Sequence, residues 1–173
     1  MIVIFYKHAI PLGFLNKRNL IADTYSQIYI QIVFSVKYRK ALIHESWEEE
    51  LYKYITGIIQ NKRQKLIAIN GMPDHIHIFI GMKPNCCLSD LVREIKKSSN
   101  SFINEKQFTE IPFYWQEGFG AFSYGFSQID NVVQYIKNQK NHHYKKTFQE
   151  EYLEYLKKFE IEYNEDYLFE WLD

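Results

Sequence analysis

Apolar and polar positions recur along the chain with two different periods, and the period predicts whether a segment is a strand or a helix. Residues 25–36 (YSQIYIQIVFSV) are rich in β-branched and aromatic side chains with partial alternation, which predicts a buried strand. Residues 65–70 (KLIAIN) and 75–82 (HIHIFIGM) predict two more strands, and the turn residues 71–74 between them indicate a hairpin. Residues 113–124, with two glycines and many aromatic residues, predict one or two short strands around a bend.

Other segments carry apolar residues at helical spacing. Residues 46–49 have the Ser-x-x-Glu form of a capping box, and the apolar spacing that follows predicts a helix to about Lys62. A second helix is expected to begin near Leu88 or Ser89, with most of its basic residues away from its core face. Residues 127–130 have the composition of a helix start and predict a third helix.

The resulting order is strand, helix, strand, strand, helix, strand, helix, which is the split βαβ arrangement. It predicts an α+β fold: a ferredoxin-like antiparallel sheet with helices on one face, followed by a C-terminal helix and tail. The 173 residues suit one domain with a hydrophobic core, and we find no internal repeat or low-complexity linker. Because ferredoxin-like folds host many functions, the function has to be inferred from the chemistry of a site.

Charge is distributed unevenly along the chain, although the net charge is +0 at pH 7. Residues 149–173 contain nine acidic residues and two lysines, which leaves a net charge of −7 there and +7 on residues 1–148. A basic body is compatible with a polyanionic partner such as a nucleic acid, because the field near a site matters more than the total charge. The same counts also describe charged residues scattered over a solvated surface.

The cysteines and the apolar start of the chain bear on the compartment. Cys86 and Cys87 are adjacent and lack the CxxC spacing of a metal site, so a reducing cytoplasm is favoured. Residues 1–20 are fairly apolar, but Lys7 and His8 interrupt the apolar run early and no basic stretch precedes it, which disfavours a secretory signal. No segment predicts a membrane span.

Two histidines lie in the segment Asp74-His75-Ile76-His77-Ile78. Side chains alternate along a strand, so His75 and His77 point to the same face and can both reach one divalent metal ion. Taken alone, the spacing describes equally well a half-buried strand with two polar residues on its exposed face.

A second polar row is expected on the third helix. Tyr135 and Gln139 are four residues apart and would lie on one face, and His142 continues that face one turn later. Taken alone, this row equally suits the end of a surface helix. Such a helix would carry these polar side chains on one face and pack its apolar side chains against the core with the other.

Together the two motifs form one candidate site. Two imidazoles and an amide oxygen leave open positions on an ion for phosphate oxygens, which favours Mg²⁺ or Mn²⁺ over a closed structural zinc site. Such an ion would polarise a phosphate, and the Tyr135 hydroxyl would attack it to form a phosphotyrosine. That bond conserves the energy of the phosphodiester, so a free DNA hydroxyl can reverse the step.

Basic residues surround these motifs, interleaved with aromatic residues. Such a mixture suits a single strand of nucleic acid, whose phosphates need neutralising and whose bases stack. Any one basic cluster is also typical of a solvated face. The candidate contacts to DNA are Lys37, Arg39, Lys40, Arg93, Lys96, Lys97, Lys140, His142 and His143.

In these motifs the chain resembles the single-tyrosine HUH transposases of small bacterial insertion sequences, the Insertion-Sequence-200-like family. The matching pieces lie within residues 24–143 and are TYSQIYIQIVFSVKYRK, GMPDHIHIFI, LSDLVREIKKSS, FYWQEGFGAFS and VVQYIKNQKNHH. The resemblance implies a ferredoxin-like domain, usually a homodimer, that cleaves and rejoins single-stranded DNA beside imperfect hairpins through a 5′-phosphotyrosine. It also implies that His75, His77 and Gln139 bind the metal ion and that Tyr135 is the nucleophile.

The chain departs from this family in two ways. Many relatives carry a histidine where this chain has Gln31, and relatives often begin close to Thr24. We therefore interpret residues 1–23 as an N-terminal extension, residues 24–146 as the catalytic domain and residues 147–173 as an acidic helical tail.

Several alternatives remain open at this point. A non-mobile relative would bind hairpins without cleaving them, and a ferredoxin-like RNA-binding module would bind without a metal ion. Nickases of plasmid replication or conjugation share the motifs but are generally larger, with appended domains. In the family the tyrosine helix can also complete the partner subunit's site, so the sequence leaves open whether Tyr135 acts within its own chain.

Overall fold

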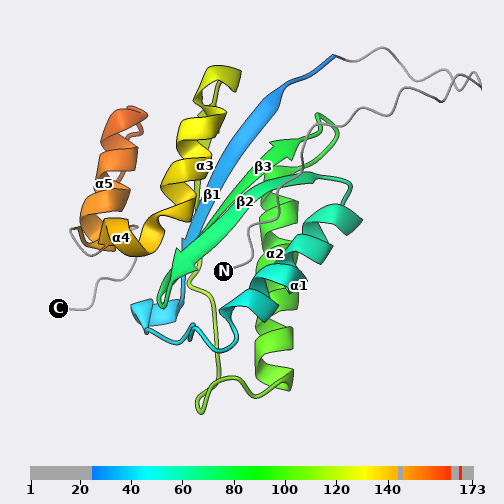
Figure 1. Cartoon of the computed structure of the whole chain (residues 1–173), viewed down its shortest axis with the longest axis vertical. Coiled ribbons are helices and arrows are strands. Elements are labelled where there is room, and N and C mark those ends of the chain that lie inside the picture. The colour runs from blue at the N-terminus through cyan, green and yellow to red at the C-terminus, as the bar shows by residue number, and fades with distance from the viewer. Residues whose placement is uncertain (1–24, 144–145, 165–167, 169–173) are drawn as a thin grey trace, which may run out of the picture.

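A four-stranded antiparallel sheet forms the centre of the computed structural model, which describes residues 25–143, 146–164 and 168 (Figure 1). The strands are β1 (Ile28–Ser35), β2 (Lys65–Met72), β3 (His75–Met82) and β4 (Gly120–Tyr124), in the spatial order β2-β3-β1-β4. The helices are α1 (Glu48–Asn61), α2 (Leu88–Glu105), α3 (Ile129–Lys137), α4 (Gln139–His143) and α5 (Phe148–Lys158), with short 3₁₀ helices η1 (Lys37–Arg39) and η2 (Phe126–Gln128). This strand order and these antiparallel pairs confirm the predicted ferredoxin-like fold.

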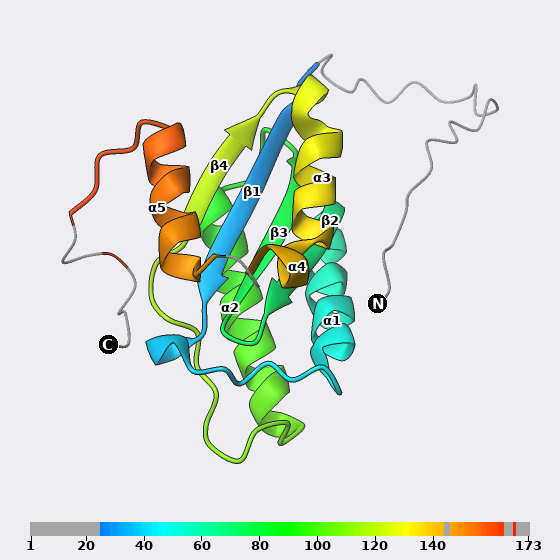
Figure 2. The ribbon, with the colours of Figure 1, turned by 60° about the vertical axis from the view of Figure 1, so that its left-hand side comes forward.

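Alternation along the strands gives the sheet two covered faces. One face carries the fully buried side chains Ile32, Phe34, Ile76, Ile78 and Ile80, which pack against α1 and α2. The opposite face is covered by α3, α4 and α5 (Figure 2). The residues between those isoleucines in the sequence therefore face the C-terminal helices rather than solvent.

The start of α1 differs from its prediction. The capping box expected at residues 46–49 is not formed, because Trp47 occupies the N-cap position and makes no side-chain cap hydrogen bond. The Ser46 hydroxyl instead lies 2.9 Å from His44 Nδ1. The Trp47 ring is buried and stacks on Phe108 with 5.0 Å between ring centroids, so aromatic packing rather than a cap fixes this helix end.

One strand prediction is corrected in extent, and another is confirmed with a single strand. β1 begins at Ile28 rather than Tyr25, because its partner strand β3 ends opposite Ile28 and the Tyr25 side chain is 92% exposed. Within residues 113–124 the structure has one strand, β4. The remaining pairing there is an isolated bridge between Trp115 and Val36.

The helix predicted to carry both Tyr135 and Gln139 is interrupted. Asn138, with φ −93° and ψ 18°, ends α3, and α4 starts at the next residue. Asn70 on β2 donates through Nδ2 to the last two carbonyl oxygens of α3, at 2.9 and 3.1 Å. These bonds satisfy carbonyls that have no partner within the helix, and they fix the end of α3 over β2.

Helix α5 shares a core with the sheet. Its start is capped by Thr147, whose backbone N–H donates to Glu150 Oε2 at 2.8 Å. Its buried stripe consists of Phe148, Glu151, Tyr152, Tyr155 and Leu156, and packs on Val33 and Phe122. Residues 1–23, interpreted above as an N-terminal extension, lie outside the described residues. No helix in the described part of the chain has an apolar stretch long enough to cross a membrane.

We predict that α5 contributes directly to the stability of the domain. Leu156 is 5% exposed in the core between α5 and the sheet, so Leu156→Ala should lower the free energy of unfolding by about 2–4 kcal/mol. The exposed Lys157→Ala on the same helix should change it by less than about 0.5 kcal/mol. Urea unfolding followed by circular dichroism measures both variants, and equal values for the two would show that α5 is not part of the core.

Candidate functional site

The two histidines of β3 lie on the sheet face that the C-terminal helices cover. His75 pairs with Ser35 and His77 with Val33 across β1, and both imidazoles are fully buried. Their ring centroids are 5.2 Å apart. They share one face, as the alternation predicts, but this face is not exposed, because α5 packs over it.

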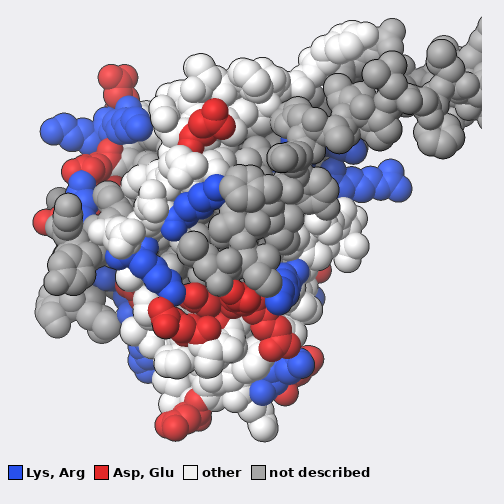
Figure 3. Space-filling model, in the orientation of Figure 1, with Lys and Arg blue, Asp and Glu red and all other residues white. Residues whose placement is uncertain are grey.

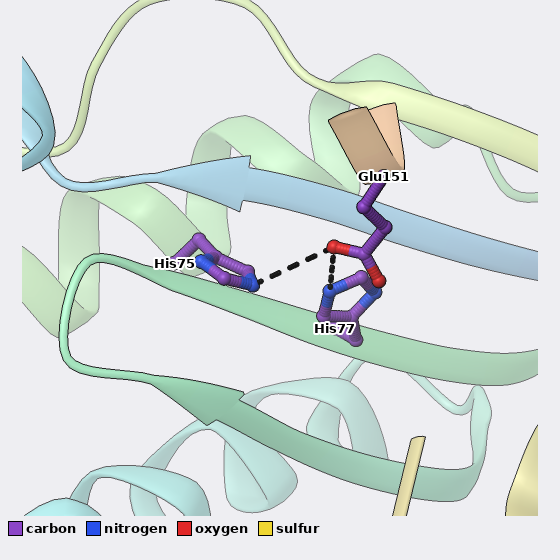
Figure 4. Close-up of side chains that lie close together, drawn as sticks. All are labelled: His75, His77 and Glu151. Carbon is purple, nitrogen blue, oxygen red and sulfur yellow. Dashed lines mark ion pairs between the residues drawn. The ribbon is translucent and has the colours of Figure 1, made fainter. Parts of the chain in front are cut away.

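A carboxylate from α5 faces both imidazoles. Glu151 is 2% exposed, and its Oε2 lies 3.5 Å from His77 Nε2 and 3.8 Å from His75 Nε2 (Figure 4). One ligand atom from each of the three residues lies within 4.8 Å of the others. Glu151 belongs to the acidic tail in the sequence, and neither sequence motif predicts it as a site residue. The available signal was an acidic residue within the apolar stripe of an amphipathic helix, between Phe148 and Tyr155.

Tyr135 and Gln139 both hydrogen-bond to the Glu151 carboxylate, at the oxygen that does not face the imidazoles. The Tyr135 hydroxyl donates a hydrogen bond to Glu151 Oε1, and Gln139 Nε2 donates to that oxygen at 3.1 Å. Gln139 is fully buried. The structure therefore brings both sequence motifs together within one chain, around a residue that neither motif contains.

The far side of the His75 ring is fixed by neighbouring groups. His75 Nδ1 donates to Asp74 Oδ1 at 2.7 Å, and Arg39 donates to Asp74 Oδ2 through Nε and Nη2 at 3.3 and 3.0 Å. Burial favours a raised pKa for Asp74, but the bonds from His75 and Arg39 outweigh it and lower the pKa to about 2. Burial lowers the pKa of His75, so its ring is neutral at neutral pH and directs Nε2 toward Glu151. The Phe148 ring stacks on the His75 ring with 4.1 Å between the ring centroids.

A buried hydrogen-bond network holds His77. Gln31 on β1 is fully buried, and its Nε2 lies 3.0 Å from His77 Nδ1 and donates to Tyr155 Oη at 2.9 Å. Tyr124 Oη donates to Gln31 Oε1 at 2.9 Å. Burial and the Glu151 carboxylate raise the pKa of both Tyr124 and Tyr155, so these hydroxyls stay protonated at neutral pH.

A cleft of about 310 Å³ lies beside this network, between α3 and α5. Tyr135, Glu151 and Tyr155 line it near the sheet, and exposed residues of the two helices, including Asn131 and Lys158, line its outer part. The cleft therefore connects the Tyr135 side of the cluster to the surface.

The donor atoms of the cluster fit a divalent cation. Two imidazole nitrogens and a carboxylate oxygen converge, a combination that first-row divalent ions accept. Among the described residues, neither His77 Nε2 nor Gln139 Oε1 has a hydrogen-bond partner. Buried polar atoms without partners are rare in folded proteins, and a cation bound between the three ligand atoms would give His77 Nε2 a partner.

Lys96, a predicted DNA contact, hydrogen-bonds to backbone groups of its own domain. Its Nζ donates to the carbonyl oxygens of Gln116 and Gly118 at 2.5 Å each and lies 5.2 Å from the centre of the Phe34 ring. Burial lowers the pKa of Lys96 to about 8. The side chain therefore anchors the loop before β4 to α2.

Two other predicted contacts form ion pairs on the surface. Lys140 lies 2.6 Å from a carboxylate oxygen of Glu45 and 2.9 Å from one of Glu48, and Arg93 lies 2.6 Å from Asp90. The face drawn in Figure 3 accordingly shows basic side chains interspersed with acidic ones, and its largest gathering of one sign is acidic. In this view the basic body of the chain forms no continuous basic patch.

Arg39, also a predicted DNA contact, is partly buried and is bound to Asp74. The other predicted contacts lie on the surface or outside the described residues. Lys37, Lys40 and Lys97 are exposed, and Lys37 lies 5.0 Å from the ring centre of its neighbour Tyr38. None of these three lysines forms an ion pair with any residue in the described part of the chain. Residues 142–143 belong to α4, but their side chains lie outside the described residues.

Comparisons with known proteins agree with this architecture. A family model described as "Transposase IS200 like" matches residues 24–139. A candidate transposase from Deinococcus radiodurans R1 is similar at 19% identity with a TM-score of 0.56, over 72% of this chain and 98% of that chain. A REP-associated tyrosine transposase bound to a REP hairpin is similar at 16% identity with a TM-score of 0.53, over 75% of this chain and 74% of that one. At these identities the structural likeness shows the fold alone, and no curated protein sequence matches the chain.

Proposed function

Because the chain belongs to the family of IS200-like transposases, whose model matches residues 24–139, we propose that it cleaves and rejoins single-stranded DNA with Tyr135 as nucleophile and a divalent metal ion. One observation carries this proposal. The Tyr135 hydroxyl, two imidazoles and the Glu151 carboxylate converge in a single buried cluster beside a cleft. A protein that only binds DNA or RNA has no need of this arrangement.

His75, His77 and Glu151 would hold the ion, with the side-chain oxygen of Gln139 as a further ligand. The carboxylate adds the negative charge that the two imidazoles lack, and oxygen donors favour Mg²⁺ or Mn²⁺. When bound, the ion would polarise the scissile phosphate and offset the charge that develops on it.

Tyr135 would form the covalent bond to DNA. A tyrosine phenol in model peptides has a pKa near ~10, so a tyrosine is a weak nucleophile at neutral pH unless a base takes its proton. Glu151 Oε1 already accepts the hydrogen bond of this hydroxyl and is the atom that would take up the proton. The Tyr135 Oη–phosphorus bond forms as the phosphorus–O3′ bond breaks, which gives a 5′-phosphotyrosine and a 3′ oxygen that takes a proton from solvent. Attack by another 3′ hydroxyl reverses these bonds and joins strands.

The substrate in this proposal is single-stranded DNA next to an imperfect hairpin. The hairpin bound to the REP-associated neighbour supports this substrate class. Exposed Lys37, Lys40 and Lys97 are the proposed phosphate contacts among the described residues, since each can neutralise a phosphate without breaking an internal ion pair. Arg93 and Lys140 would first have to leave their acidic partners.

We expect Tyr135→Phe to abolish the covalent product. A labelled single-stranded oligonucleotide that contains the DNA flanking the coding region should give a protein–DNA adduct on a denaturing gel with Mn²⁺ present. Loss of the nucleophile should reduce this adduct by at least about 10³-fold, because no other group replaces the attacking oxygen. Tyr54→Phe is the matched control, since Tyr54 stacks on Phe102 on the other face of the sheet. An undiminished adduct in Tyr135→Phe would assign the nucleophile to another tyrosine.

Removal of the metal or of its ligands should stop cleavage and weaken ion binding together. EDTA should eliminate the adduct, and His77→Ala and Glu151→Gln should each lower Mn²⁺ affinity by at least about 100-fold in titration calorimetry. His44→Ala is the control, because His44 is exposed and its side chain hydrogen-bonds only with Ser46 among the described residues. Tight hairpin binding with no adduct under any metal would instead identify a hairpin-binding protein.

Tyr135 should act within its own chain, because it contacts Glu151 of the same chain. A mixture of the Tyr135→Phe and His77→Ala variants should then form no adduct at any ratio. If the tyrosine serves a partner's metal site, a mixed dimer contains one intact site and the mixture recovers about a quarter to a half of the wild-type activity. Such recovery would overturn the arrangement within one chain.

A further inference from the structure

His77 needs a particular tautomer to bind a metal ion through Nε2. A neutral imidazole carries one proton, so Nε2 has a free lone pair only when the proton is on Nδ1. Gln31 lies at that Nδ1, with its amide nitrogen 3.0 Å away and its side chain fully buried. As the amide is oriented, it donates to Nδ1, which places the ring proton on Nε2, 3.5 Å from Glu151 Oε2.

The Gln31 amide can be turned by 180° without losing a hydrogen bond. In the present orientation its Nε2 donates to His77 Nδ1 and Tyr155 Oη, and its Oε1 accepts from Tyr124 Oη. After the turn, Oε1 accepts from His77 Nδ1–H and from the Tyr155 hydroxyl, while Nε2 donates to Tyr124 Oη. Both hydroxyls can reverse their roles because a phenol both donates and accepts. The two arrangements therefore contain the same number of bonds and suit opposite tautomers.

We propose that Gln31 is a positioning residue that sets the tautomer of His77 and turns over when the metal ion binds. In the metal-free protein the Gln31 amide stabilises the Nε2–H tautomer. In the metal-bound protein it accepts from Nδ1–H, which directs the Nε2 lone pair to the ion. This inference rests on the metal site proposed above, and it adds a residue that acts through the ligand His77.

The two histidines differ in the hydrogen-bond partner at Nδ1, and therefore in whether their tautomer is fixed. His75 Nδ1 meets the Asp74 carboxylate, which only accepts hydrogen bonds and so holds that ring ready for the metal at all times. His77 Nδ1 lies next to the Gln31 amide, which can stabilise either tautomer of the His77 ring. Metal binding would therefore reorganise the His77 side of the site, including the hydroxyls of Tyr124 and Tyr155, and leave the His75 side unchanged.

Nitrogen NMR of the full-length wild-type protein labelled with ¹⁵N-histidine tests this proposal directly. Long-range proton–nitrogen spectra distinguish a protonated Nδ1 from a protonated Nε2. In metal-free protein His77 should be protonated on Nε2 and His75 on Nδ1, and with diamagnetic Zn²⁺ as probe both should be protonated on Nδ1. If His77 carries its proton on Nδ1 with and without Zn²⁺, the amide does not turn over and the proposal is wrong.

Substitution of Gln31 adds an affinity measurement that needs no DNA. Gln31→Met removes the partner at similar size and should lower Mn²⁺ affinity by about 10- to 100-fold. Gln31→Glu offers only acceptors, so it should keep Mn²⁺ affinity within about tenfold and shift metal-free His77 to Nδ1–H. Gln64→Met is the matched control, since Gln64 is a buried amide that bonds only to Lys62 and Lys83 backbone atoms among the described residues.

Each outcome of these measurements has a separate meaning. Wild-type Mn²⁺ affinity in a folded Gln31→Met protein would overturn the role of Gln31. Failure of the DNA strand-cleavage proposal would appear instead in the adduct assay, with the tautomer change and the affinities intact. The two proposals can therefore fail independently.

Discussion

The Glu151 carboxylate is almost completely removed from water, and the arrangement of the site follows from the need to satisfy it. An ionised carboxylate loses several kcal/mol of hydration free energy on burial unless hydrogen bonds or a cation replace the water. Here one oxygen accepts from Tyr135 and Gln139, and the other faces the imidazoles of His75 and His77. The same contacts fix the Tyr135 hydroxyl beside the histidines, so the groups that stabilise the buried carboxylate also position the proposed nucleophile.

Several elements have to be placed correctly for this cluster to form. Asn70 on β2 holds the end of α3, and the break at Asn138 lets α4 begin with Gln139 directed into the cluster. Apolar packing of α5 on β1 and β4 brings Glu151 over the histidines from the opposite side. The family match ends at residue 139, so this carboxylate comes from a part of the chain beyond the matched segment. The shared core supplies the histidines and the tyrosine, and α5 adds the acidic group between them.

The basic residues divide into two groups with different physical roles. Arg39 and Lys96 are partly buried and donate hydrogen bonds to Asp74 and to backbone carbonyls, so their charge stabilises the fold around the site. Lys40 and Lys97 remain exposed on the surface. Counting lysines and arginines along a sequence cannot separate these groups, because the difference depends on which acceptors the fold brings near each side chain.

The sequence by itself determined the features that depend on local geometry. Alternation along β3 placed His75 and His77 on one face, and the order of strands and helices determined the ferredoxin-like sheet. Only the tertiary structure decided that this face is buried, that the helix breaks before Gln139, and that Gln31 and Glu151 meet His77 from positions 46 and 74 residues away. The physical reason is that strand alternation is set by neighbouring residues in the chain. The partner of a buried polar group is set by which distant elements pack against the same face.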